Sequence, residues 1–300
     1  MSYFKDGYIQ CDNHQIYYKA MGNPNGIPVV FLHGGPGGGI SEKSHTFFDL
    51  NKYFVILFDQ RGCGKSRPKF SLENNDTFSL LKDIENIRNY FQIDKWIVFG
   101  GSWGSTLSLV YAINYPYRVI ALFLRGVFLG TKEEWEWLYQ KGSDSFYSEY
   151  FEVFQNFVPE QYRNNNIEYY YKVLIGNDLE LKKKASFLWA NWETINCTLN
   201  LPKKLDSDFE DNYQISLLEA HYAYNNSFLE DNYILNNANV IKDIKTYIFQ
   251  GRYDLVCLPK YAYLLSKQLN NCETNFVKES GHSPYEKNMF SIIKKTLDEF

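Results

Sequence analysis

Residues 96–107, WIVFGGSWGSTL, carry the pattern that decides the fold. The first four residues are an apolar, β-rich run that glycine ends abruptly, which predicts a short buried strand. After the glycines the pattern becomes helical and continues to about Tyr115. Between strand and helix lies G-x-S-x-G, centred on Ser102. A serine on such a tight turn takes a strained backbone conformation with its hydroxyl exposed, which is typical of a nucleophile elbow.

Strands and helices alternate on both sides of this turn. An antiparallel hairpin is predicted first, over 8–11 and 15–20. Alternation at short intervals predicts a mostly parallel, doubly wound sheet of the α/β class with right-handed crossovers. The further predicted strands are 29–32, 54–58, 119–124, 246–250 and 274–277, and the further predicted helices are 42–52, 77–90, 260–268 and one from about 289.

The alternation stops near Phe128 and resumes only after about residue 236. The segment between them is rich in Tyr, Trp, Phe, Glu and Asn, and it has helical periodicity without a clear buried strand. We therefore expect a mainly helical cap over 128–236, inserted into a core formed by 1–127 and 237–300.

Composition narrows the possible partners and the compartment. The chain has 300 residues, a net charge of −4 and no long basic run, which argues against nucleic-acid and anionic membrane partners. No signal peptide is visible, and no apolar run approaches the ~18 residues of a membrane helix. The 5 cysteines are odd in number and lack close metal-ligand spacing. This usage predicts reduced thiols, a cytoplasmic protein and no metal site.

A serine nucleophile needs an imidazole to accept its proton and a carboxylate to orient that imidazole. In a sheet of this kind the partners follow in the order Ser, Asp or Glu, then His, each in a loop after a strand. Asp254 follows the strand 246–250, and His282 follows the strand 274–277. The sequence therefore predicts a triad of Ser102, Asp254 and His282.

Backbone N–H groups must also hold the oxyanion of the tetrahedral intermediate. The residue after the nucleophile, Trp103, supplies one donor, and the glycine loop after strand 29–32 supplies the other, which we assign to Gly35. That loop lacks the spacing of the nucleotide-binding motifs, which argues against a phosphate cradle. His33, Asp59 and Arg61 are expected to brace loops rather than to react.

Several motifs in one order resemble those of proline iminopeptidases (prolyl aminopeptidases), a family of α/β-hydrolases. The resemblance runs from about residue 5 to the C-terminus. It implies an α/β-hydrolase fold and a cytosolic serine exopeptidase that removes N-terminal proline from short peptides without a metal or other cofactor. The motifs are HGGPGG at 33–38, DQRGCGKS at 59–66, GGSWGS at 100–105, LRG at 124–126, WE at 192–193 and GRYD at 251–254.

An N-terminal proline carries a cationic secondary amine and a small apolar ring, so its pocket needs carboxylates and aromatic walls. The resemblance assigns amine binding to Glu193 and Glu219, and it suggests Phe128 for the ring pocket. Arg125 is expected to take part in substrate binding by pairing with these carboxylates. The resemblance also places the thiol of Cys257 near the site.

Two alternatives stay open at this stage. An esterase, lactonase or amidase could use the same scaffold, with the cap carboxylates not binding an amine. A hydrolase-fold binding protein without activity is a further alternative, which the presence of all the triad residues disfavours. Ala223 stands where the family has an aromatic residue, so strictness for proline is left open, as are peptide length and oligomeric state.

Overall fold

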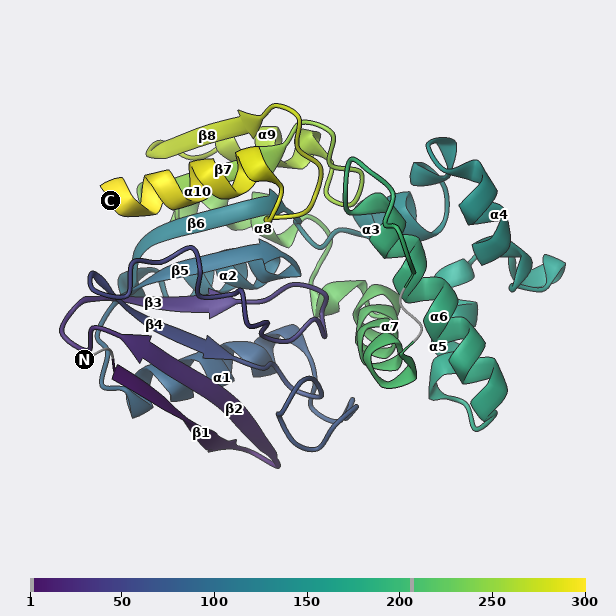
Figure 1. Ribbon diagram of the computed structural model, residues 1–300, viewed down its shortest axis with the longest axis horizontal. Coiled ribbons are helices and arrows are strands. Elements are labelled where there is room, and N and C mark those ends of the chain that lie inside the picture. Colours follow the sequence, from purple (N-terminus) through teal and green to yellow (C-terminus); the bar gives the residue numbers. More distant parts are fainter. Residues whose placement is uncertain (1–2, 206–207) are drawn as a thin grey trace.

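The computed structural model describes residues 3–205 and 208–300 of the chain, and Figure 1 shows their arrangement. One eight-stranded sheet, in the order β1-β2-β4-β3-β5-β6-β7-β8, crosses this described part. β1 pairs antiparallel with β2 and β2 with β4, whereas all later pairings are parallel. The strands are β1 (Tyr3–Cys11), β2 (His14–Gly22), β3 (Ile27–Leu32), β4 (Tyr53–Phe58), β5 (Trp96–Ser102), β6 (Val119–Val127), β7 (Lys245–Gly251) and β8 (Cys272–Val277).

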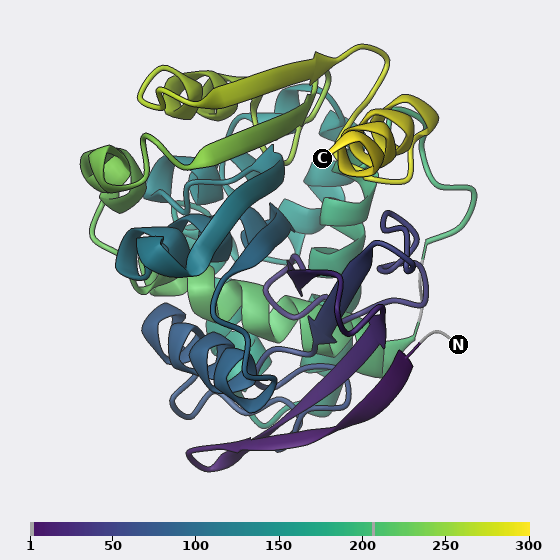
Figure 2. The ribbon, with the colours of Figure 1, turned by 90° about the vertical axis from the view of Figure 1, so that its left-hand side faces the viewer.

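Both faces of the sheet are covered, as a parallel sheet requires. Successive side chains of a strand point to opposite faces, so Val98 packs into one hydrophobic cluster while Ile97 and Phe99 pack into another. The helices α1, α2 and α9 cover the first face, and α10 covers the second, as the two sides of Figure 2 show. These helices are α1 (Thr77–Tyr90), α2 (Trp103–Asn114), α9 (Pro259–Ser266) and α10 (Lys287–Glu299).

The predicted fold class is confirmed, and the helix predicted over 77–90 has those bounds. Its start is fixed by Asp76, whose side chain accepts the N–H of Ser79. The helix predicted over 42–52 is wrong, because this segment forms only short turns. Phe47 and Phe48 are both buried under the sheet, and inserting two adjacent rings into the core overrides the local helical preference.

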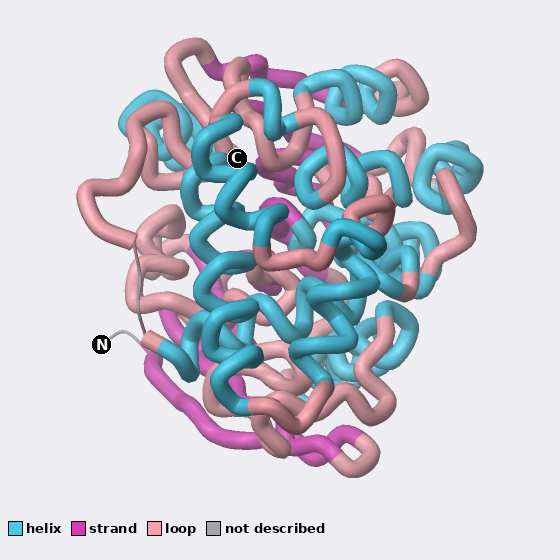
Figure 3. The backbone as a smooth tube through the Cα atoms, turned by 90° about the vertical axis from the view of Figure 1, so that its right-hand side faces the viewer, coloured by secondary structure: helices cyan, strands magenta, loops and turns pink. Residues whose placement is uncertain are grey.

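Between β6 and β7 the chain leaves the sheet and forms helices, and all but the last of them lie beyond the carboxyl ends of the parallel strands (Figure 1). The last one packs against α2. Figure 3 shows these helices lying in front of the strands when the molecule is seen from that side. They occupy the segment predicted to be a helical cap, and we use "cap" for them, while the proposed division at 127/128 and 236/237 stays a prediction. The helices are α3 (Lys132–Tyr139), α4 (Ser148–Asn156), α5 (Asn166–Ile175), α6 (Leu179–Asn196), α7 (Phe209–Tyr224) and α8 (Tyr233–Asn237).

Within the described ranges, no helix is both long enough and apolar enough to cross a lipid bilayer.

The loop after β4 is braced by buried charges, as expected. The carboxylate of Asp59 accepts the backbone N–H groups of Ile40 and Lys65, each at 2.8 Å. Arg61 donates through Nε and Nη2 to the two oxygens of Asp83, at 2.6 and 2.7 Å, and both side chains are fully buried. Such a paired guanidinium and carboxylate satisfy each other, so neither is available for chemistry.

Asp83→Asn should lower the free energy of unfolding by about 3 kcal/mol, because it leaves the buried Arg61 charge without its main partner. The measurement is urea unfolding of the intact chain. Asp12→Asn is the matched control, since Asp12 contacts the same guanidinium at 3.1 Å but its side chain is 58% exposed. Its loss should cost less than about 1 kcal/mol. Equal losses in the two variants would contradict this assignment.

Candidate active site

The serine turn has the strained geometry that the sequence predicts. Ser102 is the last residue of β5 and lies directly before α2, with φ 59° and ψ −130°. Left-handed φ in a residue other than glycine costs energy and persists only where the surroundings impose it. The cause is the close approach of α2 to β3, because a Cβ on Gly104 would lie 2.1 Å from the carbonyl oxygen of Leu32. The turn therefore presents the serine at the carboxyl end of the sheet.

Asp254 and His282 meet at the same edge, in the loops after β7 and β8. His282 Nδ1 lies 2.9 Å from Asp254 Oδ2. The other oxygen, Oδ1, accepts the backbone N–H groups of Val256 and Cys257 at 3.0 and 2.8 Å. Gln250 on β7 donates to Oδ2 at 3.1 Å. The carboxylate is thus held on several sides and can orient the imidazole.

The hydroxyl of Ser102 is not hydrogen-bonded to His282 within the described contacts. Ser102 Oγ lies 3.9 Å from the sulfur of Cys257, and His282 Nε2 lies 3.1 Å from Nη1 of Arg125. Catalytic hydrogen bonds are often formed only when substrate is bound, so this spacing does not argue against a serine–histidine pair. Burial raises the pKa of the Cys257 thiol well above its usual value, which keeps the sulfur protonated.

Arg125 contacts the loop between β8 and α10 that carries His282, which we call the histidine loop. It is not one of the pocket-lining residues. Its Nη1 donates to the carbonyl oxygen of His282 at 2.8 Å. The described ion pairs include none between Arg125 and Glu193 or Glu219, which is where pairing was expected. Its role in binding substrate stays a prediction.

A pocket joins the serine turn to the cap. It brings together Gly35 and Ser102 from the core, Phe128 directly after β6, and Glu193 and Glu219 from α6 and α7. The remaining lining residues are Glu134, Trp135, Leu138, Tyr139, Val256 and Cys257.

The most unusual group in this pocket is the carboxyl of Glu219, which is 1% exposed. Its Oε2 accepts hydrogen bonds from Tyr139 Oη at 2.9 Å and Trp189 Nε1 at 2.7 Å, whereas Oε1 accepts none from an N–H or hydroxyl group of the described residues. The carboxyl groups of Glu219 and Glu193 contact each other. Burial, and then the neighbouring Glu193, raise the pKa of Glu219 well above its usual value. Burial likewise raises the pKa of Glu193. Two buried carboxyl groups in contact favour a cationic ligand, because a cation would pair with both.

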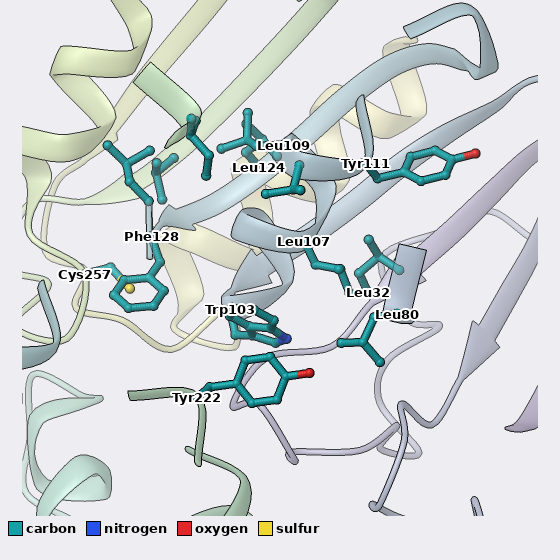
Figure 4. Close-up of a cluster of buried hydrophobic side chains, with 14 of the residues drawn as sticks. Leu32, Leu80, Trp103, Leu107, Leu109, Tyr111, Leu124, Phe128, Tyr222 and Cys257 are labelled. Atoms are coloured by element: carbon teal, nitrogen blue, oxygen red, sulfur yellow. The ribbon is translucent and has the colours of Figure 1, made fainter. Parts of the chain in front are cut away.

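An aromatic wall faces these carboxyl groups. Phe128 packs edge-on against Trp135, with ring centroids 4.9 Å apart. Helix α2 holds its backbone, because Ser105 Oγ accepts the Phe128 N–H at 2.9 Å and Thr106 Oγ1 donates to its carbonyl at 2.7 Å. Figure 4 shows the Phe128 ring beside Cys257. Helix α2 therefore positions the apolar side of the pocket as well as Ser102.

Trp103 links the elbow to the cap. Figure 4 shows its ring beside that of Tyr222 on α7, and the ring centroids are 4.7 Å apart. The Nε1 of Trp103 donates to Oε1 of Gln60 at 3.0 Å. Gly35 lines the pocket from the glycine loop after β3, with φ 107°. The use of the Trp103 and Gly35 N–H groups as oxyanion donors stays a prediction.

The sequence interpretation missed Glu134, a buried residue that lines the pocket. Its carboxylate accepts the N–H groups of Leu129 and Thr131, and burial raises its pKa to about 7. Together with Thr131 it forms the capping box that starts α3. The T-x-x-E pattern at 131–134 was the signal that could have identified it.

His33, Asp59 and Cys63 bring ligand-type atoms within 4.8 Å of one another, so we tested whether they suit a metal. His33 Nε2 already accepts the N–H of Gln60 at 3.0 Å, and Nδ1 lies 2.9 Å from a backbone carbonyl. Asp59 accepts two backbone N–H groups. Burial raises the pKa of the Cys63 thiol well above its usual value. These atoms are engaged in bracing the loops, which does not suit a metal.

Comparison with known proteins defines first the class of the protein. A family model described as alpha/beta hydrolase fold matches residues 27–288. Among solved structures, an alpha/beta fold family hydrolase from Bacillus anthracis str. Sterne aligns with a TM-score of 0.64 at 16% identity, covering 99% of both chains. A putative lipase from Acinetobacter baumannii AYE aligns with a TM-score of 0.63 at 15% identity, covering 99% of this chain and 90% of that one. The chain has an α/β-hydrolase fold.

Full-length relatives then narrow this class, and the chain belongs to the proline iminopeptidase family. It is 42% identical to a probable proline iminopeptidase of Leptolyngbya boryana, over 96% of this chain and 91% of that protein. It is 42% identical to the proline iminopeptidase of Arabidopsis thaliana, over 92% of this chain and 74% of that protein. The proline iminopeptidase of Neisseria gonorrhoeae is 41% identical, over 99% and 96%.

Glu219→Gln should raise the free energy of unfolding at pH 8 by about 1 kcal/mol, because it removes a buried charge that has only part of its hydrogen bonds. The raised pKa means that the buried carboxylate opposes folding at high pH and that this cost falls as the carboxyl is protonated. The gain should therefore shrink at pH 5. Urea unfolding at both pH values measures it. Glu180→Gln, an exposed change on α6, is the control, and a destabilised Glu219→Gln at pH 8 would contradict the assignment.

Proposed function

We propose that the protein is a prolyl aminopeptidase, a serine exopeptidase that releases N-terminal proline from peptides through an acyl-enzyme. The observation that carries the proposal is the pair of buried carboxyl groups, Glu219 beside Glu193, in the same pocket as Ser102. A pocket that selected a neutral ester would have no use for two buried carboxyl groups. The names of the full-length relatives support the same activity.

In the first half of the proposed reaction, Ser102 Oγ attacks the carbonyl carbon of the N-terminal residue while His282 Nε2 accepts the hydroxyl proton. The hydroxyl must first turn from Cys257 toward the imidazole. Asp254 holds the imidazole in the tautomer with Nδ1 protonated, through the 2.9 Å contact, and stabilises the imidazolium that forms. The N–H groups of Gly35 and Trp103 are proposed to hold the oxyanion.

In the second half of the reaction, His282 first acts as an acid and then again as a base. His282 donates its proton to the leaving amine, and the peptide bond breaks to leave the prolyl ester of Ser102. Water then attacks this ester with His282 as the base, and proline is released. No step requires a metal or an organic cofactor.

Specificity in this proposal comes from the cap. The cationic secondary amine lies between Glu193 and Glu219, and the ring contacts Phe128. Because the amine must reach the paired carboxyl groups while the carbonyl reaches Ser102, only the first residue of a chain fits. The proposed partners are therefore short peptides with N-terminal proline, in the cytoplasm, without nucleic acid or membrane.

Ser102→Ala should lower the turnover of a prolyl arylamide by more than about 10³-fold, because it removes the nucleophile. It should also abolish covalent labelling by a fluorophosphonate probe, followed by intact-protein mass spectrometry. Cys257→Ala should still be labelled, since burial keeps the thiol protonated in the native protein. Unchanged hydrolysis by Ser102→Ala would refute the mechanism.

Glu193→Gln and Glu219→Gln should lower kcat/KM for a prolyl arylamide by about 10²-fold, because each removes a charge that pairs with the amine. Turnover of a neutral acetyl ester should change by less than about twofold, since the ester places no cation there. Steady-state kinetics on both substrates measures the difference. Equal losses on both would mean that the glutamates are structural and would favour the esterase alternative.

A further inference from the structure

The helix that carries Glu193 ends against the catalytic histidine loop. Cys197 follows the last residue of α6, and its carbonyl oxygen accepts the backbone N–H groups of His282 and Ser283 at 3.0 and 2.9 Å. One carbonyl thus bonds two consecutive N–H groups of the loop that holds the proposed base. Glu193 lies one helical turn before this contact, so the amine site and the histidine are joined by a short stretch of rigid backbone.

A side chain reinforces the same junction from the core. Glu286 lies directly before α10, and its Oε1 accepts the N–H of Leu199 in the cap at 3.0 Å. Its Oε2 accepts the N–H of Gly281, the residue before His282, at 2.5 Å. A single carboxylate therefore spans the cap and the histidine loop through charge-assisted hydrogen bonds.

The helix that carries Glu219 is fastened to the glycine loop in the same manner. Gln214 on α7 donates through Nε2 to the carbonyl oxygen of Gly37 at 2.7 Å, and its Oε1 accepts the N–H of Gly64 at 2.8 Å. Helix α7 also packs directly on this loop, because a Cβ on Gly37 would lie 3.0 Å from Leu218. Gly35, the proposed oxyanion donor, is two residues away.

We propose that Gln214 and Glu286 are positioning residues that hold the glycine loop and the histidine loop in register with the cap helices bearing the paired glutamates. Neither touches the pocket, so each acts through the backbone it binds. Loops alone are mobile, whereas oxyanion donors and bases must be placed to within about half an ångström. These hydrogen bonds set the distance between the substrate amine at the glutamates and the reacting groups. The assignment rests on the proposed function for the identity of the substrate.

Kinetic measurements can distinguish a positioning role of Gln214 and Glu286 from a merely structural one. If these side chains only stabilised the docking of the cap, their loss would lower the melting temperature and leave kcat per active site unchanged. If they contributed to substrate binding, KM would rise. A positioning role lowers kcat at unchanged KM, because the substrate still binds while the reacting groups are misplaced.

The test compares Gln214→Glu and Glu286→Gln with the native chain. Each keeps the side-chain shape but places like groups against one of its backbone partners. We expect kcat for a prolyl arylamide to fall about tenfold in each variant, since a displaced donor costs less than a deleted one, and KM to stay within about twofold. The rate of fluorophosphonate labelling at Ser102 should fall in parallel. Active-site titration corrects for any unfolded fraction.

Two control variants make the same changes of charge at exposed residues away from the hydrogen bonds that join the cap to the two loops. Gln161→Glu alters an exposed cap residue, and Glu279→Gln alters an exposed carboxylate in the histidine loop. Both should keep the native kcat. Unchanged kcat and labelling rates in the two test variants, or a rise in KM without a fall in kcat, would overturn the proposal. A native chain that is labelled but does not hydrolyse prolyl substrates would refute the proposed function instead, and the labelling rates would still decide the positioning role.

Discussion

The close packing of α2 against β3 is the constraint on which the site depends. Where Gly104 meets the carbonyl of Leu32 there is no room for a side chain, so the chain must turn within a few residues of the end of β5. That turn forces Ser102 into its left-handed conformation and starts α2 at Trp103. The same helix then fixes Phe128 through two side-chain hydrogen bonds. One steric contact thus places the proposed nucleophile, the proposed oxyanion donor and a wall of the pocket.

The cap contributes a different kind of constraint, which is electrostatic. Burial raises the pKa of both Glu219 and Glu193, and the neighbouring Glu193 raises that of Glu219 further, which costs stability unless a cation is bound. A site that is destabilised without its ligand is common where function and stability compete. The aromatic residues around Glu219 serve this arrangement, because Tyr139 and Trp189 each donate one hydrogen bond and leave the second oxygen for the pocket.

Hydrogen bonds between the core and the cap hold the two parts of the site together. The carbonyl of Cys197 bonds the histidine loop, and Gln214 bonds the glycine loop. Each glutamate-bearing helix is therefore attached to one of the loops expected to do the chemistry. The residues proposed for specificity and those proposed for reactivity lie on segments far apart in the sequence, and these contacts fix their relative position.

The sequence by itself determined the fold class, the strained serine turn and the order of the triad candidates, because these follow from local periodicity, glycine spacing and strand-end placement. It also predicted that Asp59 and Arg61 brace loops. Only the tertiary structure decided which groups meet. It brought Arg125 into hydrogen-bond contact with the His282 carbonyl, turned 42–52 into a set of turns beneath the sheet, and added Glu134 to the pocket. Burial and contacts between distant segments set these outcomes, and neither is encoded in the spacing of neighbouring residues.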